Sequence, residues 1–372
     1  MIDVDSAIEA FRREVESIPG IDPAYLEDWF RRHKQTALAV IQRTISGQQA
    51  MNADRVVTLN CGLGRDSVTM LLLLLEGQLV VGGRVLNVTE VDAVVFSDTG
   101  WEWRHSYAVL FKVREMCRRV GLRVIVLAKP GEGTWEAWAG NKVRGVRRRS
   151  APPWLRADGW ASIEDKAAEG GYHRRPGILE DYQSRSTVVS ISKGDCSSNH
   201  KIEPIRRLIL DLARERFGVP DNATWGRLVR KGERRPHVSL IGIAADEVER
   251  TIGHKGLSYV TEFYPLIEMG IAKGDEQPIL ERHGLGWVRK SGCMMCPYQP
   301  PSWYWLLRES EPGIWKAVVE YEHIALTLNP RMYLTGRKPI AEVVDDWRAK
   351  NPDLTIEEVL GEGYDRCNKW AA

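Results

Sequence analysis

Long apolar runs are absent from this sequence of 372 residues, and its longest one, Met70 to Leu75, falls far short of the ~20 residues that cross a bilayer. A large net charge is also absent, because 52 Lys and Arg face 50 Asp and Glu. No global field therefore draws the chain to a membrane or to nucleic acid. The acidic, amphipathic start MIDVDSAIEAFRREVE lacks the apolar core of a signal peptide. We expect a cytoplasmic protein with no membrane partner.

Internal repeats and low-complexity tracts are absent as well, and cysteine is too scarce for a disulfide framework. Six cysteines occur in the whole chain, and two of them, Cys293 and Cys296, form a Cys-x-x-Cys. In a chain of this size such a pair is more typical of metal or redox chemistry than of disulfides.

The apolar pattern predicts three parts. Residues 1–52 carry apolar residues at helical spacing and predict a helical extension. Residues 53–290 alternate short apolar strands with amphipathic helices, which indicates an α/β domain with a parallel sheet covered by helices on both faces. An insertion rich in Gly, Pro, Trp and Arg interrupts this domain at about 130–187. Residues 291–372 predict a cysteine knuckle followed by helices.

A glycine-rich turn, CGLGRDS at 61–67, separates the first strand of this domain from a leucine-rich helix. Glycines between a strand and a helix let the backbone approach an anion, and the N-terminus of the helix adds partial positive charge. The turn lacks the Gly-Lys-[Ser/Thr] of a Walker A loop and the third glycine of the dinucleotide fingerprint. The alternative, a tight packing turn, is less favoured than a phosphate cradle.

The turn resembles the pyrophosphate-binding loop Ser-Gly-Gly-x-Asp-Ser of the N-type ATP pyrophosphatases. It departs from that pattern at Gly62 and Leu63, and leucine adopts left-handed geometry less readily than glycine. Three further segments resemble the phosphoadenosine phosphosulfate (PAPS) reductase-like branch, which includes the DNA-phosphorothioation ATP pyrophosphatase. They are VVFSDTG at 94–100, CSSNHKIEP at 196–204 and YPLIEMG at 264–270. SGCMMCPYQ at 291–299 resembles a cysteine knuckle of bacterial and phage relatives.

The resemblance implies a Rossmann-like fold of the adenine nucleotide alpha hydrolase type, and an enzyme that cleaves ATP to AMP and pyrophosphate with Mg²⁺. It implies catalytic roles for Asp66, Ser67 and Asp98, although Asp98 is equally well explained as a helix cap. The residues expected to bind the nucleotide are Asn60, Gly62, Leu63, Gly64, Arg65, Ser67, Thr99 and Gly100. We expect substrate activation by adenylation, followed by sulfur transfer to a nucleic acid or a small molecule.

The resemblance places Cys196 near Cys293 and Cys296 as a third metal ligand, and the fourth is Cys367, His200 or none. Three thiolates with an open position suit a [4Fe-4S] cluster, which we slightly favour, whereas four ligands suit structural Zn²⁺ or a closed cluster. A pair of buried reduced cysteines is the less favoured alternative. Cys61 and Cys117 are expected to be core residues.

Two further readings compete with a sulfur-transferring enzyme. A PAPS or adenylylsulfate reductase is disfavoured, because Cys367 lacks the Glu-Cys-Gly-x-x-His context of such enzymes. An inactive nucleotide-sensing or nucleic-acid-binding subunit is favoured by Leu63 and by Ile243 and Ala244, which stand where relatives carry a phosphate-binding arginine. Arg250, one helical turn on, is a candidate replacement, and Asp246 and Glu247 are candidate metal or cap residues.

The insertion carries a basic stretch, NKVRGVRRR at 141–149, flanked by tryptophans. Arginines with aromatic residues can hold a polyanion and stack on bases, so we expect closure over the nucleotide or contact with nucleic acid. A solvated charge run is at least as good an explanation. Protein partners or a homodimer are compatible with the sequence.

Overall fold

The computed structural model describes residues 50–128, 155–157, 178, 182, 195–251, 257–335 and 338–361. The expected N-terminal helical extension, nearly all of the insertion with its basic stretch, and Cys367 lie outside these residues. The chain divides into two compact units. Unit 1 holds residues 1–95, 109–124 and 209–288, and unit 2 holds residues 96–108, 125–208 and 289–372.

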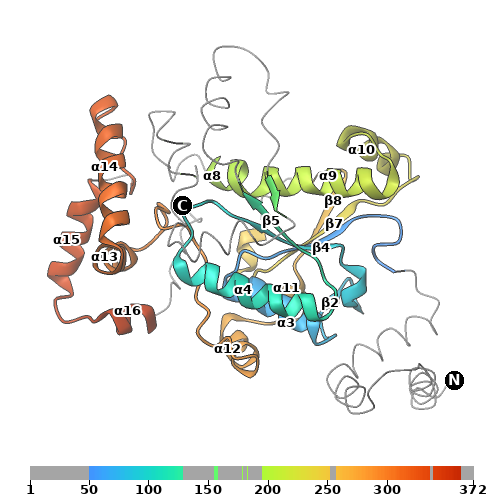
Figure 1. The fold of residues 1–372 in the computed structure, drawn as a ribbon, viewed down its shortest axis with the longest axis horizontal. Helices are drawn as coiled ribbons and strands as arrows, with labels where there is room; N and C mark the ends of the chain where they lie inside the picture. The colour runs from blue at the N-terminus through green and yellow to red at the C-terminus, as the bar shows by residue number, and fades with distance from the viewer. Residues whose placement is uncertain are drawn as a thin grey trace. The chain divides into compact units, whose positions relative to one another are not determined.

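A mixed sheet of six strands forms the centre of the fold, in the order β6-β5-β4-β1-β7-β8 (Figure 1). Five strands are parallel, and β6 pairs with β5 in the antiparallel direction at one edge. The bounds are β1 Val57–Asn60, β4 Ala93–Ser97, β5 Val124–Ala128, β6 Leu155–Ala157, β7 His237–Ile241 and β8 Val260–Phe263. This α/β Rossmann-like architecture confirms the predicted fold class.

Strand β1 lies at the switch point of the sheet. From β1 the chain builds outward through β4 and β5, and it then returns to add β7 on the other side of β1, followed by β8. In register, Leu59 of β1 pairs with Val94 of β4 and with Leu240 of β7. Open α/β sheets bind ligands outside the carboxyl ends of the strands at such a point. The segments that follow β1 and β7 are therefore the first place to look for a site.

Helices cover both faces of the sheet in unit 1, with α9 on one face and α3 and α4 on the other (Figure 1). Their apolar faces shield the central strands β1, β4 and β7, which are almost wholly buried. Further helices and a small hairpin complete this unit. The bounds are α3 Arg65–Leu75, β2 Val80–Val81, β3 Arg84–Val85, η1 Val88–Glu90, α4 Arg104–Arg119, α9 Glu203–Phe217, α10 Asn222–Arg230, η3 Ala245–Thr251, α11 Pro265–Glu268 and α12 Lys273–Arg282.

Unit 2 has its own core of aromatic and aliphatic side chains. Trp103 and Trp303 meet edge to face, with ring centroids 5.1 Å apart, beside the buried Tyr304 and Tyr321. This packing explains several of the tryptophans of the sequence without a binding role. The helical bounds are α8 Asp195–Ser197, the π-helical turn η2 Ser198–Ile202, α13 Pro301–Ser310, α14 Pro312–Leu328, α15 Ile340–Lys350 and α16 Ile356–Gly361. The expected helical C-terminal region is present.

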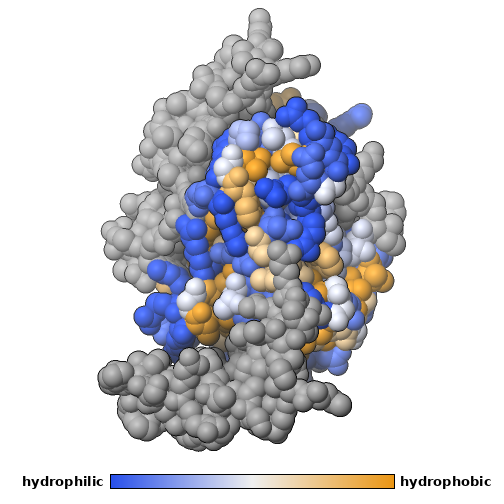
Figure 2. Space-filling view, turned by 90° about the vertical axis from the view of Figure 1, so that its right-hand side faces the viewer, coloured by the Kyte–Doolittle hydropathy of each residue, from blue (hydrophilic) through white to orange (hydrophobic). Residues whose placement is uncertain are grey.

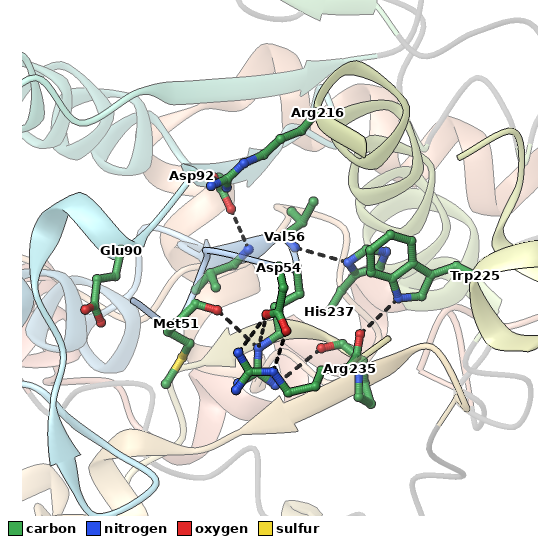
Figure 3. Close-up of polar contacts among 12 residues, drawn as sticks. Met51, Asp54, Val56, Glu90, Asp92, Arg216, Trp225, Arg235 and His237 are labelled. Carbon is green, nitrogen blue, oxygen red and sulfur yellow. Dashed lines mark hydrogen bonds and ion pairs between the residues drawn. The ribbon is translucent and has the colours of Figure 1, made fainter. Parts of the chain in front are cut away.

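The amino ends of β1 and β7 are held by a polar network in unit 1 (Figure 3). The Val56 amide donates to Nδ1 of His237 at 3.1 Å, and the His237 ring stacks on Trp225 with centroids 4.1 Å apart. Burial, with a smaller effect of Arg55, lowers the pKa of His237 to about 3, so the ring is neutral. These contacts fix the amino ends of the two strands. The loops at their carboxyl ends are therefore the candidates for a functional site.

A second part of the same network joins β1 to α9. The carboxylate of Asp92 accepts hydrogen bonds from the Val57 amide at 2.7 Å and from Arg216 at 2.6 Å (Figure 3). Close by, Arg235 forms a two-pronged pair with Asp54, at 2.7 and 2.8 Å. These contacts fix the frame on which the loops are built.

The face shown in Figure 2 carries hydrophilic residues with small groups of hydrophobic residues among them. Among the described residues, the large exposed hydrophobic side chains are Val85, Val248, Trp287, Ile324 and Leu328. No helix in the described ranges combines the length and the apolarity that a membrane span requires.

Candidate functional site

The phosphate loop, residues 61–64 of unit 1, joins the carboxyl end of β1 to α3. The Cys61 amide continues the ladder by donating to the Val95 carbonyl oxygen at 2.8 Å. Gly64 is the N-cap of α3 in extended geometry and offers no side-chain cap. The first amides of a helix have no partner within the helix, and the helix dipole places partial positive charge there. The loop therefore has the local geometry of an anion cradle.

Leu63 adopts left-handed geometry, with φ of 64°, and is the one non-glycine residue with positive φ among the described residues. This conformation costs an L-residue about 1–2 kcal/mol. The side chain is fully buried, so its packing offsets the cost. The loop thus keeps at Leu63 the turn that the related pattern assigns to glycine.

Ser67 and Cys61 face each other across the loop. Ser67 Oγ donates to the Gly64 carbonyl oxygen at 3.1 Å, and Cys61 Sγ lies 3.8 Å from Ser67 Oγ. Burial raises the pKa of the Cys61 thiol to about 11, which keeps it neutral. Ser67 therefore sits at the predicted place at the start of α3, with its hydroxyl used in this structure to brace the loop.

Gly242 follows β7 and touches the start of α3. A Cβ atom at this position would lie 2.7 Å from Ser67 Cα, 2.8 Å from Ser67 N and 2.9 Å from the Asp66 carbonyl carbon. These are backbone atoms, so a side chain at Gly242 would displace the first turn of α3. Sequence reasoning missed this residue, although it lies in the segment where a Gly-x-Arg is expected.

Asn60 links the loop to the same neighbouring strand. Its Nδ2 atom donates a hydrogen bond to Ser239 Oγ at 2.6 Å, so the amide nitrogen is bonded to the neighbouring strand β7. The Oδ1 atom is buried without a hydrogen bond among the described residues. Asn60, predicted to bind the nucleotide, is thus positioned next to the loop with one polar atom still available.

Charged side chains surround the first turn of α3. Burial raises the pKa of Asp66, and the nearby Glu247 raises it further, whereas Arg250 at 3.9 Å opposes the shift. Glu247 in turn pairs with Arg250 and, at 2.6 Å, with Lys273. Asp66 is thus one member of a network in which two cations, Arg250 and Lys273, alternate with carboxylates. Arg250 thus lies close to Asp66, and its role as a replacement for a phosphate-binding arginine stays a prediction.

Arg65, the first residue of α3, is paired with a carboxylate that the sequence analysis did not single out. Its Nε lies 3.4 Å from Oε2 of Glu276 on α12, and its Nη2 donates to the Lys273 carbonyl oxygen at 3.2 Å. Glu276 is fully buried. It shares the buried face of α12 with Ile279 and Leu280. An acidic residue at an apolar position of this helix was therefore the one sequence signal that could have identified Glu276.

The far ends of α3 and α12 are also joined. Glu76, which follows α3, accepts hydrogen bonds from Arg282 at 2.5 and 2.6 Å and lies 2.6 Å from Nε2 of His283. Burial alone would raise the pKa of Glu76, but the bonds from His283 and Arg282 outweigh it and lower the pKa to about 2. The helix that carries the loop therefore contacts α12 at both ends, through the 3.4 Å pair of Arg65 and Glu276 at one end and through these hydrogen bonds at the other.

In unit 2, Asp98, Thr99 and Gly100 form a buried turn after β4. Asp98 Oδ1 accepts hydrogen bonds from the Gly100 amide and from the Tyr107 hydroxyl, both at 2.8 Å. Thr99 Oγ1 donates to Glu102 Oε1 at 3.0 Å. These hydrogen bonds support a structural role for Asp98, although the amide that it caps is that of Gly100 in the turn rather than one in the first turn of α4. Its catalytic role stays a prediction.

Cys196, Cys293 and Cys296 belong to one hydrophobic cluster of unit 2. Glu102, placed beside Cys293 by a β-bridge, lies 3.6 Å from Lys201 Nζ. Glu102 raises the pKa of Lys201, and all three thiols contribute in the same direction. We call these five residues the cysteine region. The three predicted ligands thus belong to one cluster of unit 2, and their electrostatic influence reaches the ammonium group of Lys201, a residue that the sequence analysis did not single out.

The donor type of the cysteine region fits a metal held by thiolates, since sulfur ligands select zinc or iron-sulfur clusters and the ammonium offsets their negative charge. Within the described ranges, no three Cys, His, Asp or Glu side chains are arranged as a metal site. His200, a candidate fourth ligand, is buried, and its ring stacks on Tyr182 with centroids 6.4 Å apart. Its place in the π-helical turn η2 is typical of functional segments.

A comparison with protein-family models finds no family that matches the chain, and a comparison with curated proteins finds no relative.

Proposed function

We propose that the phosphate loop binds the pyrophosphate part of ATP and that the chain cleaves ATP at the α-phosphate to activate a substrate. The observation that supports this most is the loop at the switch point of the sheet, with Leu63 in left-handed geometry and Gly242 packed against the start of α3. A tight turn needed only for packing gives no reason for an uncapped helix N-terminus at the carboxyl end of β1.

In this proposal the loop backbone at Gly62 and Gly64 and the first amides of α3 hold the leaving pyrophosphate. A nucleophile attacks the α-phosphorus, the bond to the bridging oxygen breaks, and pyrophosphate leaves with that electron pair. Arg65 binds a phosphate oxygen, and Asp66 is the residue that would help hold Mg²⁺, which neutralises charge on the phosphates when bound. Ser67 orients the loop through its bond to Gly64.

For the second half of the reaction we propose sulfur transfer in which the cysteine region takes part. Cys196, Cys293 and Cys296 would hold a [4Fe-4S] cluster or, as the alternative, Zn²⁺. A cluster with an open position can supply a bound sulfur atom, whereas zinc would make the three cysteines structural. The acceptor is a small molecule or a nucleic acid, and the PAPS reductase-like resemblance remains part of this proposal.

Pyrophosphate release from ATP tests the first half. The wild-type chain should release pyrophosphate. Asp66→Ala should slow this release by at least about tenfold, because the carboxylate proposed to help hold Mg²⁺ is lost. Glu281→Gln, an exposed change on α12, is the matched control and should leave the rate unchanged. Binding of ATP without release by the wild type would instead support the nucleotide-sensing subunit.

Metal and sulfide analysis of protein purified without oxygen tests the second half. Iron, acid-labile sulfide and a broad absorbance near ~400 nm would support cluster-assisted sulfur transfer. A colourless protein with one zinc would exclude cluster-assisted sulfur transfer. ATP-dependent adenylation would then be tested alone.

A further inference from the structure

The ion pair of Arg65 and Glu276 leaves much of its hydrogen-bonding capacity unused. The two carboxylate oxygens of Glu276 and the Nε atom of Arg65 are all buried. None of these three atoms has a hydrogen bond among the described residues. The 3.4 Å separation is an electrostatic contact without hydrogen-bond geometry. A buried polar group left in this way is destabilising. A pair held so loosely next to the phosphate loop can exchange partners when an anion arrives.

The charges that face Glu276 come from three elements. Asp66 and Arg65 belong to α3, Asp246 to η3, and Lys273 to its own helix α12. Burial raises the pKa of Glu276 to about 8, Asp66 and Asp246 raise it as well, and Arg65 and Lys273 oppose the shift. At neutral pH the carboxyl group is therefore mostly protonated, and the pull on the guanidinium is weak.

Two other charged groups of η3, Arg250 and Glu247, bond to each other, and Glu247 also bonds to Lys273. Glu276 is the carboxylate that lies against Arg65, so its ionisation acts directly on that guanidinium.

We propose that Glu276 is a positioning residue that restrains Arg65 against α12, and that a diphosphate bound in the phosphate loop takes the guanidinium over from it. The proposal rests on the proposed function, since it concerns the same loop. Ionised Glu276 holds the guanidinium of Arg65 and places a negative charge near the anion. Protonated Glu276 releases the guanidinium. Diphosphate binding therefore favours the protonated acid, and the affinity falls as the pH rises through about 8.

Binding of inorganic pyrophosphate to the full chain, measured by calorimetry at about pH 6 and about pH 9, tests this linkage. Glu276→Gln mimics the protonated acid. We expect it to match the wild type at the lower pH and to bind about tenfold more tightly at the higher pH, which is the effect of one pKa unit. Pyrophosphate itself titrates in this range, so the ratio of variant to wild type at each pH is the readout. Glu281→Gln, the same change at an exposed position of α12, should keep the ratio at one.

Two further variants separate restraint of Arg65 from a purely structural role. In the Arg65→Ala background, Glu276→Gln should lose most of its effect at high pH, because the cation that it controls is gone. The affinity ratio of wild type to Arg65→Ala should also fall as the pH rises. This second measurement needs no substitution at position 276 and holds even if Glu276→Gln does not fold.

Ratios that do not change with pH, in a wild type that binds pyrophosphate, would overturn the role of Glu276 and leave the proposed function standing. A wild type that binds neither pyrophosphate nor ATP at any pH would overturn both.

Discussion

In the phosphate loop of unit 1 the groups that we propose to hold a ligand belong mainly to the backbone, whereas in the cysteine region of unit 2 they are side chains. The loop takes its shape from Leu63 and from close contact with Gly242. The cysteine region takes its character from three thiols and the Glu102–Lys201 pair, set in an aromatic core. Backbone geometry tolerates sequence change as long as the turn survives, but ligand side chains do not. The two regions should therefore respond differently to substitution.

The largest expected effect is on metal content. Replacing Cys293 and Cys296 together by serine should remove essentially all bound iron or zinc, because half of a thiolate site cannot hold the metal. Pyrophosphate affinity should stay unchanged if the loop works independently. Metal analysis and calorimetry on the same preparation check both parts.

Cys117→Ala, a buried thiol of α4, serves as the control and should keep the metal. Unchanged metal content in the double variant would show that the cysteine region holds no metal.

The next effect is that of a side chain at Gly242. Gly242→Ala should weaken pyrophosphate binding by about tenfold or more and lower the free energy of unfolding by about 1–3 kcal/mol, because the new methyl group collides with the backbone of α3. Calorimetry and urea unfolding measure the two changes. Gly313→Ala is the control, since a Cβ there meets nothing within 4 Å. Equal behaviour of the two variants would contradict the importance of this contact.

A smaller effect concerns the clamp at the far end of α3. The lowered pKa of Glu76 means that its contribution to stability is present above its ordinary value of 4.5 and is lost as the pH falls through about 2. Glu76→Gln should lower the free energy of unfolding by about 2 kcal/mol at neutral pH, reduced from the full shift by the water around Arg282. The difference from wild type should vanish in strong acid.

Urea unfolding over a pH series tests this prediction. Glu115→Gln is the control, because Glu115 pairs with Arg118 and Arg119 on the open surface and its loss should change little. A wild-type advantage that persists in strong acid would exclude the clamp as its source.

The smallest effect isolates the left-handed turn. Leu63→Gly and Leu63→Ala both lose the buried side chain, but alanine keeps the unfavourable positive φ. Glycine should therefore be the more stable variant by about 1 kcal/mol, the reverse of the usual order. Chemical unfolding of the pair measures the difference, and an alanine variant of equal or higher stability would show that the turn relaxes.

The sequence was sufficient for the parts of the fold that repeat a pattern. The strand, the glycine turn and the following helix were predicted at 55–76, and they correspond to β1, the phosphate loop and α3. The helix α10 was not predicted. Its apolar residues Trp225, Leu228 and Val229 have helical spacing, but Gly226 between them is typical of a helix end.

The position of the candidate site followed from the sequence where it depends on local residues, and its partners were missed where they depend on tertiary contact. Residues of the turn itself, such as Asp66 and Ser67, lie where the motif indicated. Gly242 and Glu276 are more than 170 and 200 residues away along the chain, and only packing against α3 reveals them. A single buried charge such as Glu276 does not change the periodicity of a helix. In the sequence it is visible only as one polar residue at an otherwise apolar position.

The leucine in the phosphate loop also has a consequence for the entropy of binding. A glycine at this position would sample many conformations, and a ligand would have to select one of them. Leu63 is anchored by its buried side chain, so the loop becomes ordered when the chain folds. If the loop binds an anion as proposed, the anion meets a preorganised cradle, and its affinity is not reduced by a loss of loop freedom.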